Sequence, residues 1–507
     1  MSENRLFTSE ELTKLTTPLP DQIIKCIKNK KLDEALSLNE EMKKTRIILH
    51  DYFADSCTVL WSWVGDNLGE DMVEDMFRYI FDQSAKRQVY NTAGLNRIYP
   101  RLTTGLIAAT AWRSHSCFGY GEHPAKFKMT EDEEKFTFHM HPCASGARLW
   151  LRGMYEPGRG GKLTEKAHGW SFNRKDFPYY CIHSAFLNEI LPYEEFGYLM
   201  WPTDEPKGPE DVCRWHVYKD PNNIPDKYYE RHGFKKNKID PVPAKNEKKI
   251  YYSEDELKEI VRPMTDRIRE KIMGNNLDDA VNLCREVRYE FLFLHDLYMN
   301  MILSTYTFIS EKSGESKLGD ALDFQFEKCL KPILEEKTSL SPREKIKFFA
   351  LKIFGVDNCN QTGFPKGKFT VTETAEDIIF KLDPCGSGGR LLRGGAYKPM
   401  SPWRKFKEEL FDSLTIKINN VFTIPESMMM SNYEKTGGYV TQRKAYAQGK
   451  TCNEHSWSFG KKETPYYCCQ CGMLQDKSGK SYLKISPPEK DGSPCIWKIK
   501  KSNLGEL

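Results

Sequence analysis

The sequence lacks the features that mark membrane, secreted and nucleic-acid-binding proteins. No apolar run approaches the ~20 residues that cross a bilayer, and the first residues, MSENRLFTSEELTKL, lack the pattern of a secretory signal. No basic block is present, and 75 basic and 71 acidic side chains leave a formal charge of only +4. We therefore expect a cytoplasmic protein with neither a membrane nor a nucleic-acid partner.

Histidine is scarce, whereas cysteine is not. The chain has 11 histidines and 15 cysteines, and only His295 and His455 follow residue 251. Without an export signal the thiols are expected to stay reduced. The Gly-x4-Gly-Lys-Ser/Thr spacing of a phosphate-binding loop is also absent. Cysteines beside a rare histidine therefore point to metal ligation.

Four short blocks occur twice in the same order. HGWSFNRKDFPYYC (168–181) and HSWSFGKKETPYYC (455–468) agree at nine of fourteen positions, and FHMHPCASGARL (138–149) resembles FKLDPCGSGGRL (380–391). A helical stretch and a Cys-x-Trp segment are paired likewise. The spacing is too long for a solenoid repeat, so the pattern predicts tandem duplication of a whole domain.

At 507 residues the chain also exceeds the size at which a single core keeps growing. The segment 221–253 is rich in Pro, Asn and Lys and poor in aliphatic residues, which is typical of a linker. The predicted organisation is an N-terminal extension, a first repeat, that linker and a second repeat, at 1–19, 20–220, 221–253 and 254–507.

Each repeat is predicted to be α+β. Apolar residues at three- and four-residue spacing predict a helical layer, with breaks near Asn29 and Gly274. KFTFHMHP and EDIIFKLDP then alternate as strands do, and DVCRWHVYK and PCIWKIKK close the repeats as further strands. The fold class is thus a helical layer followed by a small, mainly antiparallel sheet with cysteine-bearing loops.

The second repeat carries an insertion at about 396–450. The distance from Arg393 to His455 is about 46 residues longer than the matching distance from Arg152 to His168. Such a loop is either a lid or partner contact, or an insertion without a function of its own.

Both repeats offer ligands for zinc, which takes four, typically thiolate and imidazole. An iron–sulfur cluster is the alternative for such a thiol-rich set. The second repeat supplies a complete set and the first a similar one, in which Ser184 stands where Cys471 stands in the second. The fourth position of the first repeat is open to Cys213, to His183 or to a water molecule. The predicted ligands are Cys385, His455, Cys468 and Cys471, and Cys143, His168, Cys181 and Cys213.

A closed shell is usually structural, whereas three protein ligands and an exchangeable position are typical of catalytic zinc. The first repeat is therefore the candidate catalytic domain. His141 and His183 near its ligands are candidate general acid/base groups, and Arg148 is a candidate anchor for an anionic substrate.

Further candidates come with structural alternatives. Arg390, Tyr179 and Tyr180 are candidate substrate-binding residues, although the tyrosines equally suit a core. His50 is a candidate base or a core histidine, and Asp51 is not expected to orient it because adjacent helix positions point about 100° apart.

Three functions follow from these patterns. The first is a zinc-dependent hydrolase or lyase acting on a small polar or anionic molecule. The second is a zinc–thiolate group transferase that activates a substrate thiol, and the third is a non-enzymatic binding protein whose metals hold loops together. The sequence leaves the oligomeric state open.

Overall fold

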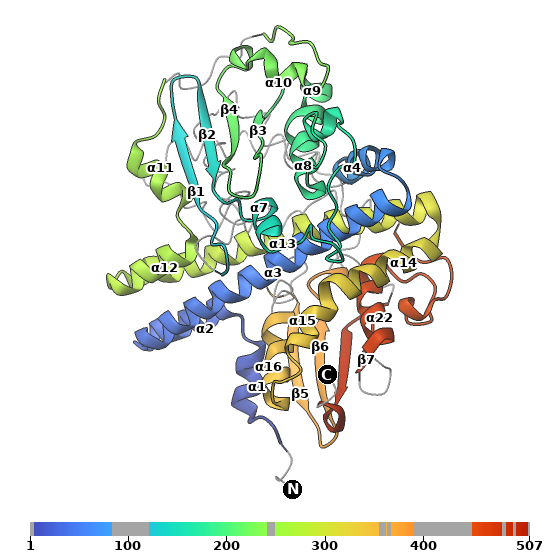
Figure 1. Cartoon of the computed structure of the whole chain (residues 1–507). Helices are drawn as coiled ribbons and strands as arrows, with labels where there is room; N and C mark the ends of the chain where they lie inside the picture. The colour runs from blue at the N-terminus through green and yellow to red at the C-terminus, as the bar shows by residue number, and fades with distance from the viewer. Residues whose placement is uncertain are drawn as a thin grey trace. The chain divides into compact units, whose positions relative to one another are not determined.

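The computed structural model describes residues 5–83, 121–240, 249–353, 361, 367–389, 449–478, 483–489 and 493–504. Contacts within the chain divide these residues into two compact units. Unit 1 comprises the described residues up to 56 and from 265 onwards, and unit 2 those between 57 and 264. The fold is α+β, because each unit holds one four-stranded antiparallel sheet and several helices (Figure 1).

The sheet of unit 2 has the strand order β1-β2-β4-β3. Its strands are β1 (Phe127–Glu131), β2 (Lys135–Met140), β3 (Thr203–Asp204) and β4 (Cys213–Tyr218). Its helices are α4 (Asp71–Gln83), α7 (Gly146–Leu151), η2 (Gly169–Ser171), η3 (Tyr179–Cys181), α8 (Ile182–Ala185), η4 (Phe186–Ile190), α9 (Leu191–Phe196), η5 (Pro221–Asn223), α10 (Asp226–Glu230) and α11 (Glu254–Val261).

The sheet of unit 1 has the corresponding order β5-β6-β8-β7. Its strands are β5 (Lys368–Glu373), β6 (Asp377–Asp383), β7 (Leu483–Ser486) and β8 (Cys495–Lys500). Its helices are α1 (Ser9–Thr16), α2 (Leu19–Lys28), α12 (Met264–Met273), α13 (Leu277–Ser313), α14 (Glu315–Gln325), η6 (Phe326–Leu330), α15 (Lys331–Glu336), α16 (Pro342–Phe348), η7 (Phe349–Ile353), η9 (Ser456–Ser458), α22 (Tyr466–Ser478) and η10 (Lys501–Asn503). The first residue of α12, Met264, belongs to unit 2. Helix α3 (Leu32–Asn67) contributes to both units.

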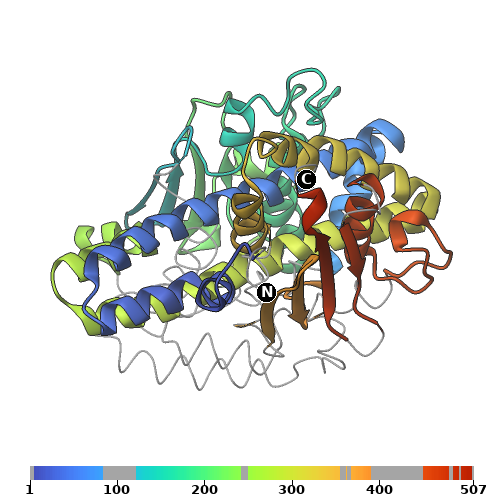
Figure 2. The same ribbon diagram turned by 90° about the horizontal axis from the view of Figure 1, so that it is seen from below.

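Local sequence explains the helix boundaries. A capping box begins α1, in which Thr8 accepts from the Glu11 amide and Glu11 accepts from the Thr8 amide, and Ser253 with Glu256 does the same for α11. Gly314 ends α13 at φ +86°, a backbone conformation that few other residues adopt. In unit 1, α2 packs beside α13 (Figure 2). No helix in the described part of the chain is long and apolar enough to cross a membrane.

Helix α1, in the predicted extension, packs on the sheet of the second repeat, and α11, at the start of the second repeat, packs on the sheet of the first. In unit 1, α1 lies against β5, where Glu373 accepts hydrogen bonds from the amides of Leu6 and Phe7. In unit 2, α11 lies against β1, where Glu131 accepts from the amides of Tyr251 and Tyr252. The compact units therefore contain different stretches of the chain from the two predicted repeats, 20–220 and 254–507.

Two segments predicted as an extension and a linker contribute to the cores. Phe7 is 2% exposed and belongs to the core of unit 1. Tyr228 and Tyr229 of α10 are 3% and 1% exposed and pack with Leu199 and Ile224 in unit 2. These aromatic rings bury more apolar surface than the polar composition around them suggested. The predicted insertion at 396–450 lies outside the described residues, apart from its last two.

Candidate functional site

Three cysteines gather in unit 2. Cys143 follows β2, Cys181 ends η3, and Cys213 begins β4 opposite Met140 of β2. A Cβ atom built on Gly146 would lie 2.5 Å from Sγ of Cys181 and 3.7 Å from Sγ of Cys143. Glycine is therefore required at position 146, because a side chain there would displace the sulfur of Cys181.

Burial sets the protonation state of these thiols. It raises the pKa of Cys143, Cys181 and Cys213 above the ordinary thiol value, and the neighbouring sulfurs raise it further for the last two. The Ala147 amide donates to Sγ of Cys143 at 3.1 Å, and this bond opposes the effect of burial. The cluster is thus protonated at neutral pH unless a cation binds, so it is not a nucleophile by itself.

The predicted histidine ligands instead contact carboxylates. Nε2 of His168 lies 2.6 Å from Oε1 of Glu70, and its ring stacks on Trp170 with centroids 4.1 Å apart. In unit 1, Nε2 of His455 lies 3.0 Å from Oε2 of Glu315, and its ring stacks on Trp457 at 4.3 Å. The contacts described for the two histidines include no thiol.

The two carboxylates also order the loops that carry these histidines. Burial alone would raise the pKa of Glu70, but backbone amides of Glu165 and Lys166, together with His168, hold it below its usual value. Glu315 has a lowered pKa for equivalent reasons, with its side-chain and backbone donors outweighing burial. Each imidazole is therefore one of several hydrogen-bonding partners of a glutamate carboxylate.

Four thiols of unit 1 line a cavity of about 140 Å³. Cys468 and Cys471 lie one turn apart on α22, and Sγ of Cys385 accepts from the Gly389 amide at 2.9 Å. Cys495, which was not among the predicted ligands, lines the same cavity. Cys469 differs, because its Sγ donates to the Pro465 carbonyl at 3.5 Å.

Neither cluster is arranged around a single point. Within the described ranges, no group of three or more His, Cys, Asp or Glu side chains has the geometry to hold a metal ion as it stands. Binding would require the cysteine side chains to rotate toward the ion. Zinc or an iron–sulfur cluster at either place stays a prediction.

The candidate acid/base groups have different environments. His141 is exposed in the turn that follows β2. His183 has its Nδ1 at the Tyr180 carbonyl, and burial lowers its pKa to about 4. Its ring is therefore neutral at pH 7, with Nδ1 as the donor and Nε2 as an acceptor.

The other candidates lie mainly in cores. Arg148 is 3% exposed and its Nη1 donates to the carbonyls of Glu122 and His123 at 2.8 and 3.2 Å. Tyr179 donates to Glu70 at 3.0 Å, and the ring of Tyr180 stacks on Trp61.

Arg390 lies outside the described residues, whereas His50 is described and fully buried. Its Nδ1 is 3.1 Å from Oδ1 of Asp51. The expectation that Asp51 would not orient His50 was wrong, because the two side chains bend toward each other despite the angle between adjacent helix positions.

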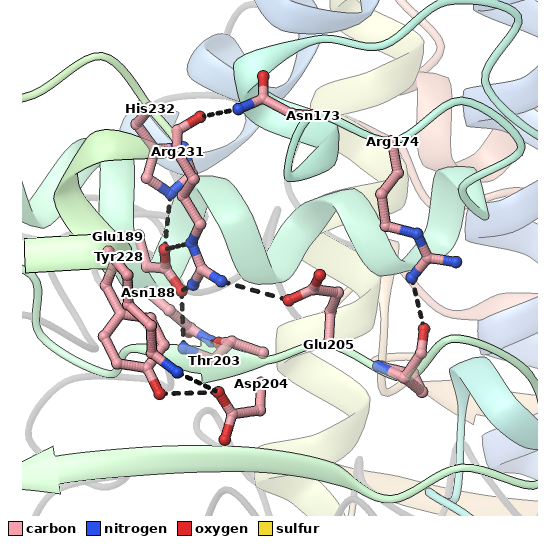
Figure 3. Close-up of polar contacts among 12 residues, drawn as sticks. Asn173, Arg174, Asn188, Glu189, Thr203, Asp204, Glu205, Tyr228, Arg231 and His232 are labelled. Atoms are coloured by element: carbon pink, nitrogen blue, oxygen red, sulfur yellow. Dashed lines mark hydrogen bonds and ion pairs between the residues drawn. The ribbon is translucent and has the colours of Figure 1, made fainter. Parts of the chain in front are cut away.

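A buried charge cluster in unit 2 was missed by the sequence analysis (Figure 3). Glu189 is fully buried and accepts from the Thr203 amide at 2.7 Å, from Nε of Arg231 at 3.0 Å and from Nε2 of His232 at 2.6 Å. Nη1 of Arg231 also reaches Glu205 at 3.2 Å. The cluster fixes the chain after α10.

No sequence signal pointed to this cluster, because its arginine and histidine fall in the predicted linker. The guanidinium of Arg231 lies over the rings of Phe172 and Tyr228, 4.4 and 4.9 Å from their centroids. The charge is thus paired and also packed between aromatic faces.

The two thiol clusters and the paired His–Glu contacts are therefore chemical features that recur in the described residues of both units. Their positions correspond along the two halves of the sequence, from Cys143 and Cys385 to Cys213 and Cys495. No protein-family model, no curated protein and no solved structure matches the chain, so a function has to be argued from these groups alone.

Proposed function

We propose that the chain is a zinc-dependent enzyme whose ion is held by Cys143, Cys181 and Cys213 in unit 2. The observation that supports this is the gathering of three thiols from three separate segments, with the sulfurs of Cys143 and Cys181 beside Gly146 and Cys213 within electrostatic reach of both. A soft ion is the partner that three neighbouring sulfurs prefer, and it would replace their protons. Isolated buried cysteines that serve only as small apolar side chains need not meet in this way.

The proposed site has one exchangeable position. Ser184 occupies the sequence position that corresponds to Cys471, so the unit 2 cluster has three thiols where unit 1 has four. Three protein ligands and one open position are typical of catalytic zinc. Unit 2 is therefore the proposed catalytic unit.

The sulfur-only ligand set favours group transfer to or from a thiol. Three thiolates give the ion much of their electron density, so bound zinc is a weak Lewis acid that instead binds and activates a substrate thiol. Arg148 is already held by two backbone carbonyls, which weakens its candidacy as an anchor for an anionic substrate. Zinc–thiolate transfer is thus the preferred reaction type.

Hydrolase or lyase chemistry on a small polar molecule is the second candidate. It is favoured by His183, which burial keeps neutral at pH 7 and whose Nε2 can accept a proton. In this case His183 would act as the general base.

We also propose that the chain arose by tandem duplication. Both units pair a histidine with a buried glutamate, stack that histidine on a tryptophan two residues later, and place a thiol sulfur at the amide four residues on. The matching strand orders support the same view.

Cobalt substitution tests the proposed ligand set and reaction type together. Co²⁺-loaded protein should show intense thiolate-to-cobalt charge-transfer absorption, and a small thiol such as 2-mercaptoethanol should shift its visible bands at the open position. Acetate, which offers only oxygen, should not. A shift by acetate but not by the thiol would favour the second candidate, and the absence of thiolate-to-cobalt absorption would contradict the site.

A further inference from the structure

The cavity of unit 1 has walls that are mostly apolar. Aliphatic and aromatic side chains from α3, η6, α15, α16, η7 and α22 line it, together with the four thiols. Its volume of about 140 Å³ is close to that of the apolar cavities, ~150 Å³, that bind one benzene molecule.

One polar group on the cavity wall lacks a partner. Oε1 of Gln470 accepts a hydrogen bond from the Tyr52 hydroxyl at 3.1 Å, and both residues line the cavity. Nε2 of Gln470 is buried and has no hydrogen-bond partner in the described part of the chain. A buried donor left in this state is costly, so Nε2 marks the place where a ligand acceptor gains most.

We propose that this cavity binds a small apolar molecule, about the size of one aromatic ring, that carries one hydrogen-bond acceptor facing Nε2 of Gln470. A ketone or aldehyde oxygen on an aromatic ring or a short hydrocarbon has this chemistry. The wall supplies apolar contact for the body of the ligand and Gln470 supplies its orientation. The proposal lies beyond the zinc site of unit 2 and does not depend on it.

A matched pair of ligands separates the two parts of the proposal. Acetophenone and ethylbenzene have nearly the same shape, but only acetophenone carries a carbonyl oxygen. Binding is measured by titration calorimetry on the full chain without added metal. Gln470→Met conserves the volume of the side chain and removes its donor, so the cavity should keep its shape.

Wild type should bind both ligands. Gln470→Met should weaken acetophenone binding about tenfold, as loss of one buried hydrogen bond predicts, and leave ethylbenzene within about twofold. Cys469 is the neighbour of Gln470 in the sequence but does not line the cavity, so Cys469→Ala should change the affinity for neither ligand. Binding of neither ligand by wild type, or an equal effect of Gln470→Met on both, would overturn the proposal.

Discussion

The Glu189→Ala variant should lose about 3–5 kcal/mol of its free energy of unfolding, the largest change in stability that we expect from a single substitution. Glu189 is fully buried, and its carboxylate binds Arg231, His232 and the Thr203 amide. Its removal leaves the charge of Arg231 without its main partner in the interior. Urea unfolding followed by circular dichroism measures the change.

Glu205→Ala is the matched control. Glu205 contacts the same arginine but keeps 23% of its side chain exposed, so its loss should cost at most about 1 kcal/mol. Equal effects of the two substitutions would contradict the view that Glu189 holds the cluster together.

The contribution of Glu189 should also depend on pH. Burial alone would raise its pKa, but the charge of Arg231 and the hydrogen bond from His232 hold it below the usual glutamate value. A carboxyl group whose pKa is lowered by folding stabilises the folded state at pH values above its pKa in the unfolded chain, which is about 4.3 for glutamate. This stabilisation is lost as the pH falls. The stability difference between wild type and Glu189→Ala should therefore shrink below about pH 4, and a constant difference would contradict this explanation.

Cys181→Ser should lower zinc affinity by about three orders of magnitude. Zinc binds thiol-rich sites with a free energy of about 10–16 kcal/mol, of which one thiolate in three contributes roughly 4 kcal/mol. A loss of this size corresponds to about a thousandfold in the dissociation constant. Competition with a chromophoric chelator measures the affinity. Serine conserves the size of the side chain, so the substitution tests ligation more than packing.

Two controls define the ligand set. Cys57→Ser changes another buried thiol of unit 2, located on α3, and should leave zinc affinity within about threefold. His168→Ala removes a residue paired with Glu70 and should also retain zinc. Loss of zinc from His168→Ala as large as from Cys181→Ser would make the histidine a ligand and the sulfur-only set wrong.

Sequence periodicity predicted the elements of the fold well. The α+β class is confirmed, and the alternating segments before each Pro-Cys turn form β2 and β6. The predicted helix breaks are also confirmed, because α2 ends at Lys28 and α12 at Met273. These signals are local, because apolar spacing and turn residues determine the structure of only the few residues around them.

Such local signals do not identify contacts between residues that are far apart in the sequence. Glu70 and His168 are 98 positions apart, and Leu6 and Glu373 are 367 apart. A pattern of apolar positions shows which face of α1 is buried but not which strand covers it, so the exchange of α1 and α11 could not be derived. The charge of Arg231 in a polar stretch likewise indicated solvent, whereas the fold provides Glu189 as its partner.

The most direct test of the zinc site is the metal content of anaerobically purified protein, measured by plasma mass spectrometry after dialysis, for wild type and Cys143→Ser. The account predicts zinc retained by wild type, with one equivalent fewer per chain in the variant. Wild type without retained metal, or a variant with unchanged metal content, would contradict the assignment of zinc to Cys143, Cys181 and Cys213.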